Sequence, residues 1–257
     1  MSKSYRIAIA VIGLASFGVV LFLLTRPPHK PVAFIHICAS EPGRVQNKGI
    51  RPFAAVVPRL KWDAGQTIRC RFLSGDHFIQ SKIETFAHQW EKYANIHFVF
   101  SQDPDAEIRI DINDNGQSNS YIGTEALLID PTERTMNFGW FTDTTGDDEF
   151  SRTVLHEFGH ALGLIHEHQS PAGGIHWNRP AILAAYAQDG PPWNDPAFVD
   201  SNVIAKYTRD ATQYTRLDPK SIMMYPIPDS FTTDHFSVGW NDYLSQTDEA
   251  FIHQQYP

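Results

Sequence analysis

The 257-residue chain has little cysteine and no excess of positive charge. Its two cysteines, Cys38 and Cys70, do not form a CxxC pair, so a cysteine-based metal site is not expected. A disulfide between them and a buried thiol at Cys70 both fit the sequence, which does not fix their geometry. Lys and Arg total 21 against 29 Asp and Glu, a formal net charge of −8. Because phosphate binding requires a basic face, nucleic acid is not an expected partner.

Internal repeats and low-complexity tracts are also missing. The composition is that of an ordinary globular protein, with 42% hydrophobic and 19% charged residues. A chain of this length can bury a sizeable core without needing disulfides or oligomerisation. The sequence leaves the oligomeric state open.

The N-terminus carries a long apolar stretch. Residues 7–24 contain no charged side chain and follow Lys3 and Arg6. Their length reaches the lower limit for spanning a bilayer. The absence of an A-x-A pattern favours an uncleaved signal-anchor over a cleaved signal peptide within residues 1–25. Either interpretation places the rest of the chain outside the cytosol, secreted or tethered to a membrane through residues 7–24. Residues 26–60, rich in Pro and Gly, are expected to form a linker or pro-like segment.

The remaining part, residues 61–257, is expected to form one folded domain. Alternation of apolar and polar residues predicts strands, and apolar residues at helical spacing predict an amphipathic helix over 83–93. The strands are predicted at residues 67–73, 96–100, 107–112, 121–129 and 135–141. This order of elements favours a mixed sheet packed against helices.

A second helix is predicted to start at residue 147. Its first three residues, 147–149, are acidic, which suits the positive end of the helix dipole. His156 and His160 are one turn apart, so both imidazoles can reach one zinc ion. Glu157 lies about 100° around the helix, where it can act on a metal-bound water without being a ligand. An apolar stripe is expected to face the core: Phe150, Val154, Phe158 and Ala161.

Gly163 and His166 extend this pattern. Glycine tolerates the left-handed conformation that ends a helix, and such a turn would bring His166 back toward the metal. Residues 156–166 match HExxHxxGxxH at every fixed position. Three histidines that leave one position open are typical of a catalytic zinc site, so we expect one catalytic Zn²⁺.

A Pro-flanked segment downstream, residues 221–225 (SIMMY), is predicted to form a turn. Met223 within it is expected to form a hydrophobic floor beneath the three histidines, which would exclude water and fix the orientation of the ligands.

Together these motifs resemble the metzincin metallopeptidases and, within them, the astacin family. Glu167 directly follows the third histidine, as in the family's HExxHxxGxxHE pattern. The Met-turn has the family's form, with Tyr225 two residues after Met223. Residues 61–63 (KWD) resemble the start of an astacin catalytic domain. Residues 245–248 (SQTD) form a capping-box pattern, and the segment that follows resembles the closing helix.

The resemblance covers residues 61–257 and implies a metzincin-like α/β (α+β) fold. This fold has a twisted, mixed five-stranded sheet packed on two long helices, and an irregular C-terminal subdomain that ends in a helix. Tyr225 would be a further zinc ligand at rest that moves to stabilise the oxyanion of the reaction. In astacins the residue matching Glu167 pairs through water with the processed N-terminus. The substrate-binding edge strand would contain Ser120, Tyr121, Ile122 and Gly123.

The expected function is that of a zinc-dependent endopeptidase acting on proteins or peptides. Glu157 would take a proton from the zinc-activated water and pass it to the leaving amine. The substrate would lie extended against the edge strand at 120–127. Two alternatives are a zinc hydrolase of non-protein amides or esters, and a non-catalytic surface binding module on the same fold. Glu157 disfavours the second, since a pure binder does not need an acid beside the metal-bound water.

Overall fold

The computed structural model describes residues 58–257 except 114 and 207–215. The predicted signal-anchor or signal peptide, Cys38 and the linker up to residue 57 lie outside the described residues. Cys70 is a buried free thiol, and burial raises its pKa well above the ordinary value. None of the helices in the described part of the chain is long and apolar enough to cross a bilayer.

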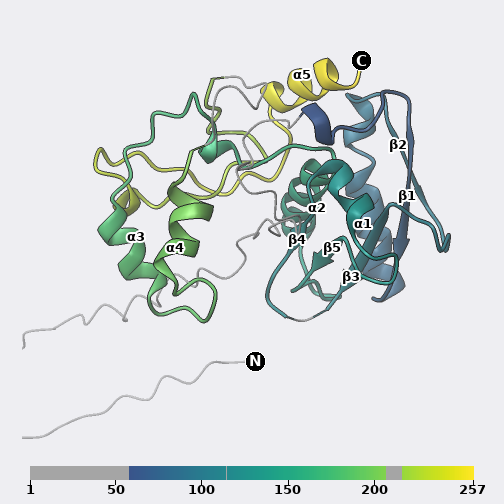
Figure 1. Ribbon diagram of the computed structural model, residues 1–257, viewed down its shortest axis with the longest axis horizontal. Helices are drawn as coiled ribbons and strands as arrows, with labels where there is room; N and C mark the ends of the chain where they lie inside the picture. The colour runs from purple at the N-terminus through teal and green to yellow at the C-terminus, as the bar shows by residue number, and fades with distance from the viewer. Residues whose placement is uncertain (1–57, 114, 207–215) are drawn as a thin grey trace, which may run out of the picture. The chain divides into compact units, whose positions relative to one another are not determined.

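A mixed five-stranded sheet occupies the N-terminal half, residues 58–161 (Figure 1). Its strands are β1 (Thr67–Phe72), β2 (His97–Phe100), β3 (Ile108–Ile112), β4 (Asn119–Ser120) and β5 (Met136–Phe138). They lie in the order β2-β1-β3-β5-β4. The pairs β1–β2, β1–β3 and β3–β5 are parallel, whereas β4 runs antiparallel to β5. The expected mixed five-stranded sheet is therefore confirmed.

Two helices pack against each other and against this sheet: α1 (His77–Ala87) and α2 (Asp147–Ala161) (Figure 1). Helix α1 begins where the Asp76 side chain accepts a hydrogen bond from the Phe78 amide. Phe158 of α2 meets Phe98 of β2 edge to face, with ring centroids 5.0 Å apart. One core cluster joins strands and helices, and each large side chain fully buried in it contributes about 1.5–3 kcal/mol.

The prediction of a strand over residues 121–129 is wrong. Strand β4 ends at Ser120, one more ladder bond joins the Tyr121 amide to Thr135, and Gly123–Leu128 forms a 3₁₀ helix (η3). Gly123 has φ +51°, and a Cβ there would lie 1.9 Å from the Leu60 carbonyl oxygen, so the chain leaves the extended conformation at this glycine. The helix predicted over residues 83–93 ends earlier than expected. Helix α1 stops at Ala87, and a separate 3₁₀ turn follows at Trp90–Lys92.

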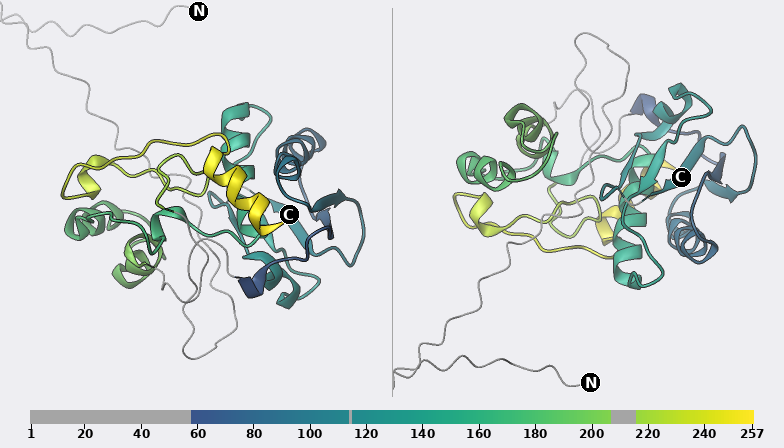
Figure 2. Two further views of the ribbon diagram at one scale, coloured as in Figure 1. Left: turned by 90° about the horizontal axis from the view of Figure 1, so that it is seen from above. Right: turned by 90° about the horizontal axis from the view of Figure 1, so that it is seen from below.

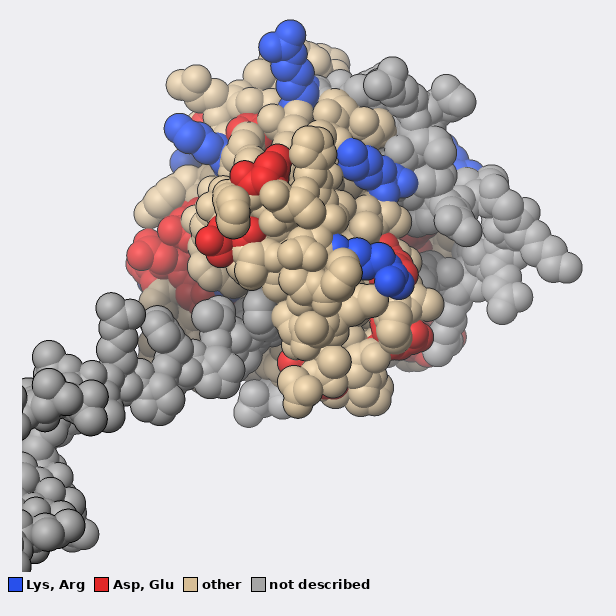
Figure 3. All heavy atoms as spheres, turned by 90° about the vertical axis from the view of Figure 1, so that its left-hand side faces the viewer, with Lys and Arg blue, Asp and Glu red and all other residues tan. Residues whose placement is uncertain are grey.

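The C-terminal half, residues 162–257, has few regular elements in its described part. Helices α3 (Arg179–Tyr186) and α4 (Pro196–Val199) lie to one side of the sheet in both views of Figure 2. Figure 3 shows the face nearest these helices, where Lys and Arg are interspersed with Asp and Glu. The predicted irregular C-terminal subdomain is confirmed. Short turns fill much of the remainder: η4 (Glu167–Gln169), η5 (Asp200–Ile204) and η7 (Asp229–Phe231).

The closing helix α5 (Gln246–Gln255) starts with the predicted capping box between Ser245 and Asp248. After it, the Tyr256 hydroxyl donates to the Leu162 carbonyl at 2.8 Å and accepts from the Trp62 amide at 3.3 Å. These bonds attach the end of the chain to the C-terminal end of α2, where the histidine motif lies.

Candidate active site

The histidine motif begins on α2 and continues past its C-terminal end. Gly163 has φ +91°, the left-handed conformation expected for it. Its amide donates to the His160 carbonyl at 2.8 Å, and the Leu164 amide donates to the Gly159 carbonyl at 2.9 Å. This pair of bonds is the Schellman arrangement, which satisfies the last helical carbonyls and reverses the chain. The reversal carries His166 back beside the helix.

The structure brings His156, His160 and His166 together. One ring nitrogen from each lies within 4.8 Å of the others, and all three side chains are buried. The Nε2 atoms of His160 and His166 are 3.1 Å apart. Among the described residues this is the group that can hold a metal ion.

Backbone carbonyls fix the orientation of two of these rings. Nδ1 of His156 lies 2.8 Å from the Ile222 carbonyl oxygen, and Nδ1 of His160 lies 2.8 Å from that of Leu164. Because a carbonyl only accepts, both Nδ1 atoms carry the proton and both Nε2 atoms are left unprotonated, with a lone pair. This is the tautomer that a metal ligand requires.

The donor set fits zinc. Nε2 of His156 is buried without a hydrogen-bond partner among the described residues, which would be costly unless another group meets it. Burial lowers the pKa of all three imidazoles, to about 4 for His160, so they are neutral near pH 7. Three neutral imidazoles are a ligand set of catalytic zinc sites.

The predicted turn at residues 221–225 lies against α2. Met223 is 2% exposed, and a Cβ on Gly159 would come within 2.4 Å of its sulfur, so the glycine lets the methionine approach the helix. The buried carboxylate of Asp248 accepts from the Ser221 hydroxyl at 2.6 Å and from the Ile222 amide at 2.8 Å. Sequence reasoning missed this role of Asp248, whose only signal was its place in the capping box.

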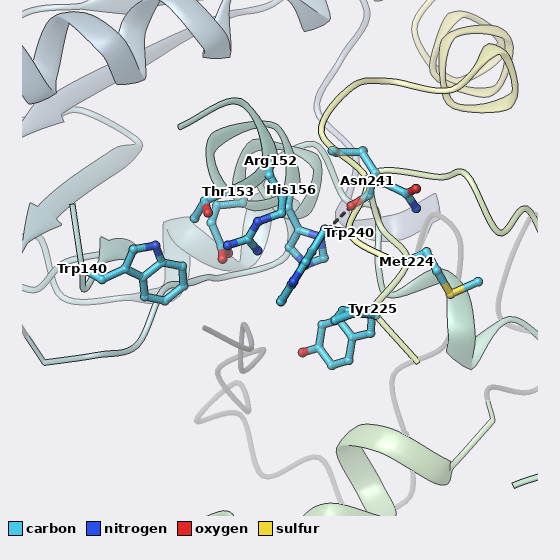
Figure 4. A pocket seen from close by; sticks show the side chains of 11 residues that line it. Trp140, Arg152, Thr153, His156, Met224, Tyr225, Trp240 and Asn241 are labelled. Atoms are coloured by element: carbon cyan, nitrogen blue, oxygen red, sulfur yellow. Dashed lines mark hydrogen bonds between the residues drawn. The ribbon is translucent and has the colours of Figure 1, made fainter. Parts of the chain in front are cut away.

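A cavity that is open to solvent lies beside the histidines (Figure 4). His156, Glu157 and Tyr225 all line it. The Tyr225 ring lies 4.2 Å from the His166 ring and stacks on His168 at 4.5 Å. Glu157, the predicted base, and Tyr225, the predicted oxyanion donor, therefore line the same cavity as the predicted ligand His156. Trp140 also lines this cavity, whereas its neighbour Phe141 belongs to the core.

The predicted edge-strand residues lie close to the turn after α2, since a Cβ on Gly123 would come within 3.3 Å of the Gly163 Cα. Ser120 is buried in β4, and Ile122 packs with Ile165 beneath Leu60. Only Ser120 of the four belongs to a strand, because the strand has ended before Ile122 and Gly123 begins η3. The segment is thus the edge of the sheet, but a shorter one than predicted.

The solved structures that resemble this chain include two of myroilysin and one of a hatching enzyme. One structure of myroilysin shares 46% sequence identity and a TM-score of 0.76, over 79% of this chain and 98% of that one. A second structure of myroilysin shares 43% sequence identity with a TM-score of 0.61, over 82% of this chain and 92% of that one. High choriolytic enzyme 1, a hatching enzyme zinc-protease from Oryzias latipes (medaka fish), shares 18% sequence identity with a TM-score of 0.54, over 80% of this chain and 98% of that one. At this identity the likeness supports the fold alone.

A scan against family models and a search of curated proteins give no match. The identity to myroilysin is nevertheless high over almost its whole length, and the fold is the one expected. The chain therefore belongs to the astacin-like family of the metzincin clan and is a zinc metalloendopeptidase.

Proposed function

We propose that the protein cleaves internal peptide bonds of proteins or peptides with a zinc ion held by His156, His160 and His166. The observation that carries this proposal is the buried group of three neutral imidazoles, two of them oriented by backbone carbonyls, with Glu157 in the adjoining cavity. Zinc bound there would supply Lewis acidity, polarising the substrate carbonyl and lowering the pKa of a water molecule.

Glu157 is the proposed general base. Its side chain is 1% exposed and lines the cavity beside His156, so it is held close to the reacting atoms without being part of the ligand group. It takes the proton of the attacking water and then gives it to the leaving amine. Tyr225, on the same cavity, donates its hydroxyl proton in a hydrogen bond to the oxyanion that forms on the scissile carbonyl.

Three further features have proposed roles beside the zinc ligands and the catalytic side chains. Gly163 reverses the chain so that His166 reaches the site, and Met223 forms the floor under the imidazoles. The extended backbone from Ser120 to Ile122, ending at Gly123, is the edge along which the substrate backbone lies. We place the enzyme outside the cytosol, because residues 7–24 have the length and composition of an export or anchor segment.

The base is tested with Glu157→Ala. We expect the purified variant to bind one zinc per chain, as measured by elemental analysis, and to lose casein cleavage by about 100- to 10,000-fold. Glu84→Ala, an exposed glutamate on α1, is the matched control and should keep full activity. Undiminished casein cleavage by Glu157→Ala would disprove the assignment. Turnover of small amides or esters by the wild type, without cleavage of casein, would favour the non-protein hydrolase instead.

A further inference from the structure

The segment that leaves β3 carries a spacing that the peptidase chemistry does not use. Asp111, Asn113 and Asn115 stand at every second position and Gly116 follows them directly, which gives the pattern D-x-N-x-N-G. Side-chain oxygens at the first, third and fifth positions and a glycine at the sixth form the first half of a calcium-binding loop. The twelfth position is Ile122 instead of Glu, so the segment is not an EF-hand, and the pattern alone does not make a site.

The backbone after Asn115 has the conformation that this pattern requires. Gly116 has φ +71°, the left-handed conformation that suits the sharp turn at the sixth position. The seventh position supplies a backbone carbonyl to calcium in such loops, and here it is Gln117. A Cβ built on Gly139 would lie 2.2 Å from the Gln117 carbonyl oxygen and 2.3 Å from Asn115 Oδ1. These two oxygens are therefore close enough together to bind one ion.

The sheet adds a side chain that lies against these oxygens. Asn137 of β5 is the direct partner of Asp111 in the parallel ladder, so the two side chains share one face of the sheet. Met136 is buried in the core, which places Asn137 and Asp111 on the opposite face. Nδ2 of Asn137 donates to the Gln117 carbonyl at 2.5 Å and to Asn115 Oδ1 at 3.2 Å. The first, fifth and seventh positions of the pattern thus meet around Asn137.

Two amide oxygens of this group, Asn113 Oδ1 and Asn137 Oδ1, are buried without a hydrogen-bond partner among the described residues. Asn137 is 0% exposed, so its side chain has no contact with bulk solvent. A buried oxygen that accepts nothing is costly, and a hard cation is one of the groups that satisfies it. Nε2 of His156 is buried in the same way at the proposed zinc site.

Half a turn of each amide would bring these oxygens to the other ligands. Nδ2 of Asn113 donates to Asp111 Oδ2 at 2.6 Å, so rotation places Asn113 Oδ1 beside that carboxylate. The same rotation places Asn137 Oδ1 beside the oxygens of Gln117 and Asn115. Oxygens that face one another repel unless a cation lies between them. The two amides can therefore either donate to these oxygens or join them around a cation.

The charges around the group favour a weak site. Asp111 is the one carboxylate among the five groups, and it accepts from the Ser74 hydroxyl and from the Ile112 amide. Burial raises the pKa of Asp111, but its hydrogen bonds outweigh burial and leave the pKa below its ordinary value, so the carboxylate is ionised. Nη1 of Arg134 lies 3.7 Å from Asp111 Oδ2 and opposes the binding of a second positive charge.

We propose that this group of oxygens binds one Ca²⁺ ion. Its ligands are four side-chain oxygens and one backbone carbonyl: Asp111, Asn113, Asn115, Asn137 and Gln117. Water completes the coordination, because calcium takes about 6–8 oxygen ligands. An all-oxygen set suits calcium better than zinc, which prefers nitrogen and sulfur. With one carboxylate we expect a dissociation constant of about 10⁻⁴–10⁻³ M, the range of extracellular calcium modules. This inference goes beyond the proposed function, since it does not involve the peptidase site.

Calcium binding is measured on the zinc-loaded full-length protein, dialysed free of calcium, by calorimetric titration with CaCl₂. We expect one ion per chain and much weaker binding of Mg²⁺, which demands a near-ideal octahedron. About 10 mM CaCl₂ should raise the melting temperature by about 3–10 °C over NaCl of equal ionic strength. Zinc content, measured before and after, should not change. Absence of calcium binding in this range, or equal binding of Mg²⁺, overturns the inference.

Asn115→Asp distinguishes a calcium ligand from a packing residue. Asn115 is exposed, and its Oδ1 accepts from the Gln117 amide and from Asn137, so aspartate keeps these bonds and adds a charge. We expect the dissociation constant for Ca²⁺ to fall about 10-fold, with the calcium-free melting temperature unchanged. Asn194→Asp, at an exposed asparagine between α3 and α4, is the matched control and should bind calcium as the wild type does. An unchanged dissociation constant in Asn115→Asp overturns the inference.

Two further variants change the charge on the other side of the site. Asp111→Asn removes the carboxylate and should abolish calcium binding up to about 10 mM, whereas Arg134→Gln removes the opposing charge and should strengthen it about 2- to 10-fold. If Asp111→Asn lowers the melting temperature even without calcium, Arg134→Gln and Asn115→Asp decide, since both keep the printed hydrogen bonds of Asp111. Wild-type calcium affinity in these two variants refutes the site.

Discussion

The two halves of the domain place their side chains by different means. In residues 58–161 regular strands and helices do so, and the histidines of α2 follow from helical spacing alone. In the described part of residues 162–257 regular helices are short, and positions are set by turns and by bonds between side chains and backbone. The proposed zinc site needs both halves, because two ligands come from the first and His166 and Tyr225 come from the second.

This difference indicates where the site is vulnerable. The N-terminal half can lose single contacts, since its core is one large cluster of apolar side chains. The C-terminal half depends on a few buried polar groups, above all on Asp248, which holds the segment whose carbonyl orients His156. Removing such a group leaves its partners buried and unsatisfied, which costs more than losing one apolar contact of the same size.

Asp248→Ala is expected to have the largest effect and tests the difference between the two halves most directly. Its side chain accepts from the Ser221 hydroxyl and from the amides of Ile222 and Ser245, so the variant leaves three donors without their acceptor. We expect the free energy of unfolding to fall by about 2–4 kcal/mol and zinc affinity to fall about 10- to 100-fold. Urea unfolding and zinc titration with a competing chelator measure the two effects.

Asp143→Ala is the control for this variant, because Asp143 is exposed and lies outside the turn. It should change stability by less than about 0.5 kcal/mol. Wild-type stability and zinc affinity in Asp248→Ala would show that the C-terminal half does not depend on buried polar anchors.

Tyr225→Phe tests the contribution of the C-terminal half to the chemistry. The variant keeps the ring tilted against His166 and stacked on His168, and it removes only the hydroxyl. Loss of an oxyanion donor predicts a fall in kcat of about 100-fold, with KM and zinc content unchanged. Tyr243→Phe, at an exposed tyrosine, should leave kcat unaltered. A wild-type kcat in Tyr225→Phe would reduce Tyr225 to a packing residue.

Gly159→Ala tests the contact between the two halves. Alanine is the better helix former by about 1 kcal/mol, but its Cβ would meet the Met223 sulfur at 2.4 Å. Because Met223 is buried and must shift, we expect a net loss of about 1–2 kcal/mol in the free energy of unfolding. The added loss should shrink when Met223→Ala is combined with it. Gly174→Ala, where the new Cβ meets nothing within 4 Å, is the control, and an equal loss there would refute the steric explanation.

The sequence was sufficient to predict most of the N-terminal half because its signals are periodic. The sheet and the motif helix from Asp147 were predicted from alternation, from helical spacing and from the acidic residues of the first helical turn. The prediction failed at residues 121–129, where apolar Leu127 and Leu128 imitated a strand although both are exposed on η3. The approach of Leu60 to Gly123, which ends the strand, is a contact between distant residues that no local pattern contains.

For the site, the residues with a fixed spacing could be predicted and those that orient them could not. His156, His160 and His166 follow from the motif, and the turn at Gly163 follows from the properties of glycine. The carbonyl of Ile222 that fixes His156 carries no sequence signal, since every residue has a carbonyl. Trp240, which also lines the cavity, is far from α2 along the chain, so only the fold brings it to Arg152.

The smallest effect is expected from an ion pair at the surface of the N-terminal half. Glu107 accepts from Arg69 side-chain nitrogens and from the Arg69 amide at 2.8 Å. Burial raises the pKa of Glu107, but the bonds from Arg69 outweigh it, so its folded-state pKa lies below 4.5. A lowered carboxylate pKa stabilises the fold above the unfolded-state pKa, and this contribution is lost as the pH falls through the folded-state pKa.

Glu107→Gln should therefore lower the melting temperature slightly at pH 7, and the difference from the wild type should vanish as the pH falls below 4.5. Thermal unfolding of the two proteins between pH 3 and pH 7 measures this, and Glu84→Gln is the control at an exposed site. The effect should also shrink in 1 M salt, because partly exposed charges are screened there, whereas the Asp248 effect should persist because its partners are buried. If the effects of Glu107→Gln and Asp248→Ala were equally sensitive to salt, the two halves would not differ in this way. The N-terminal half would then depend on its surface ion pair as much as the C-terminal half depends on its buried carboxylate.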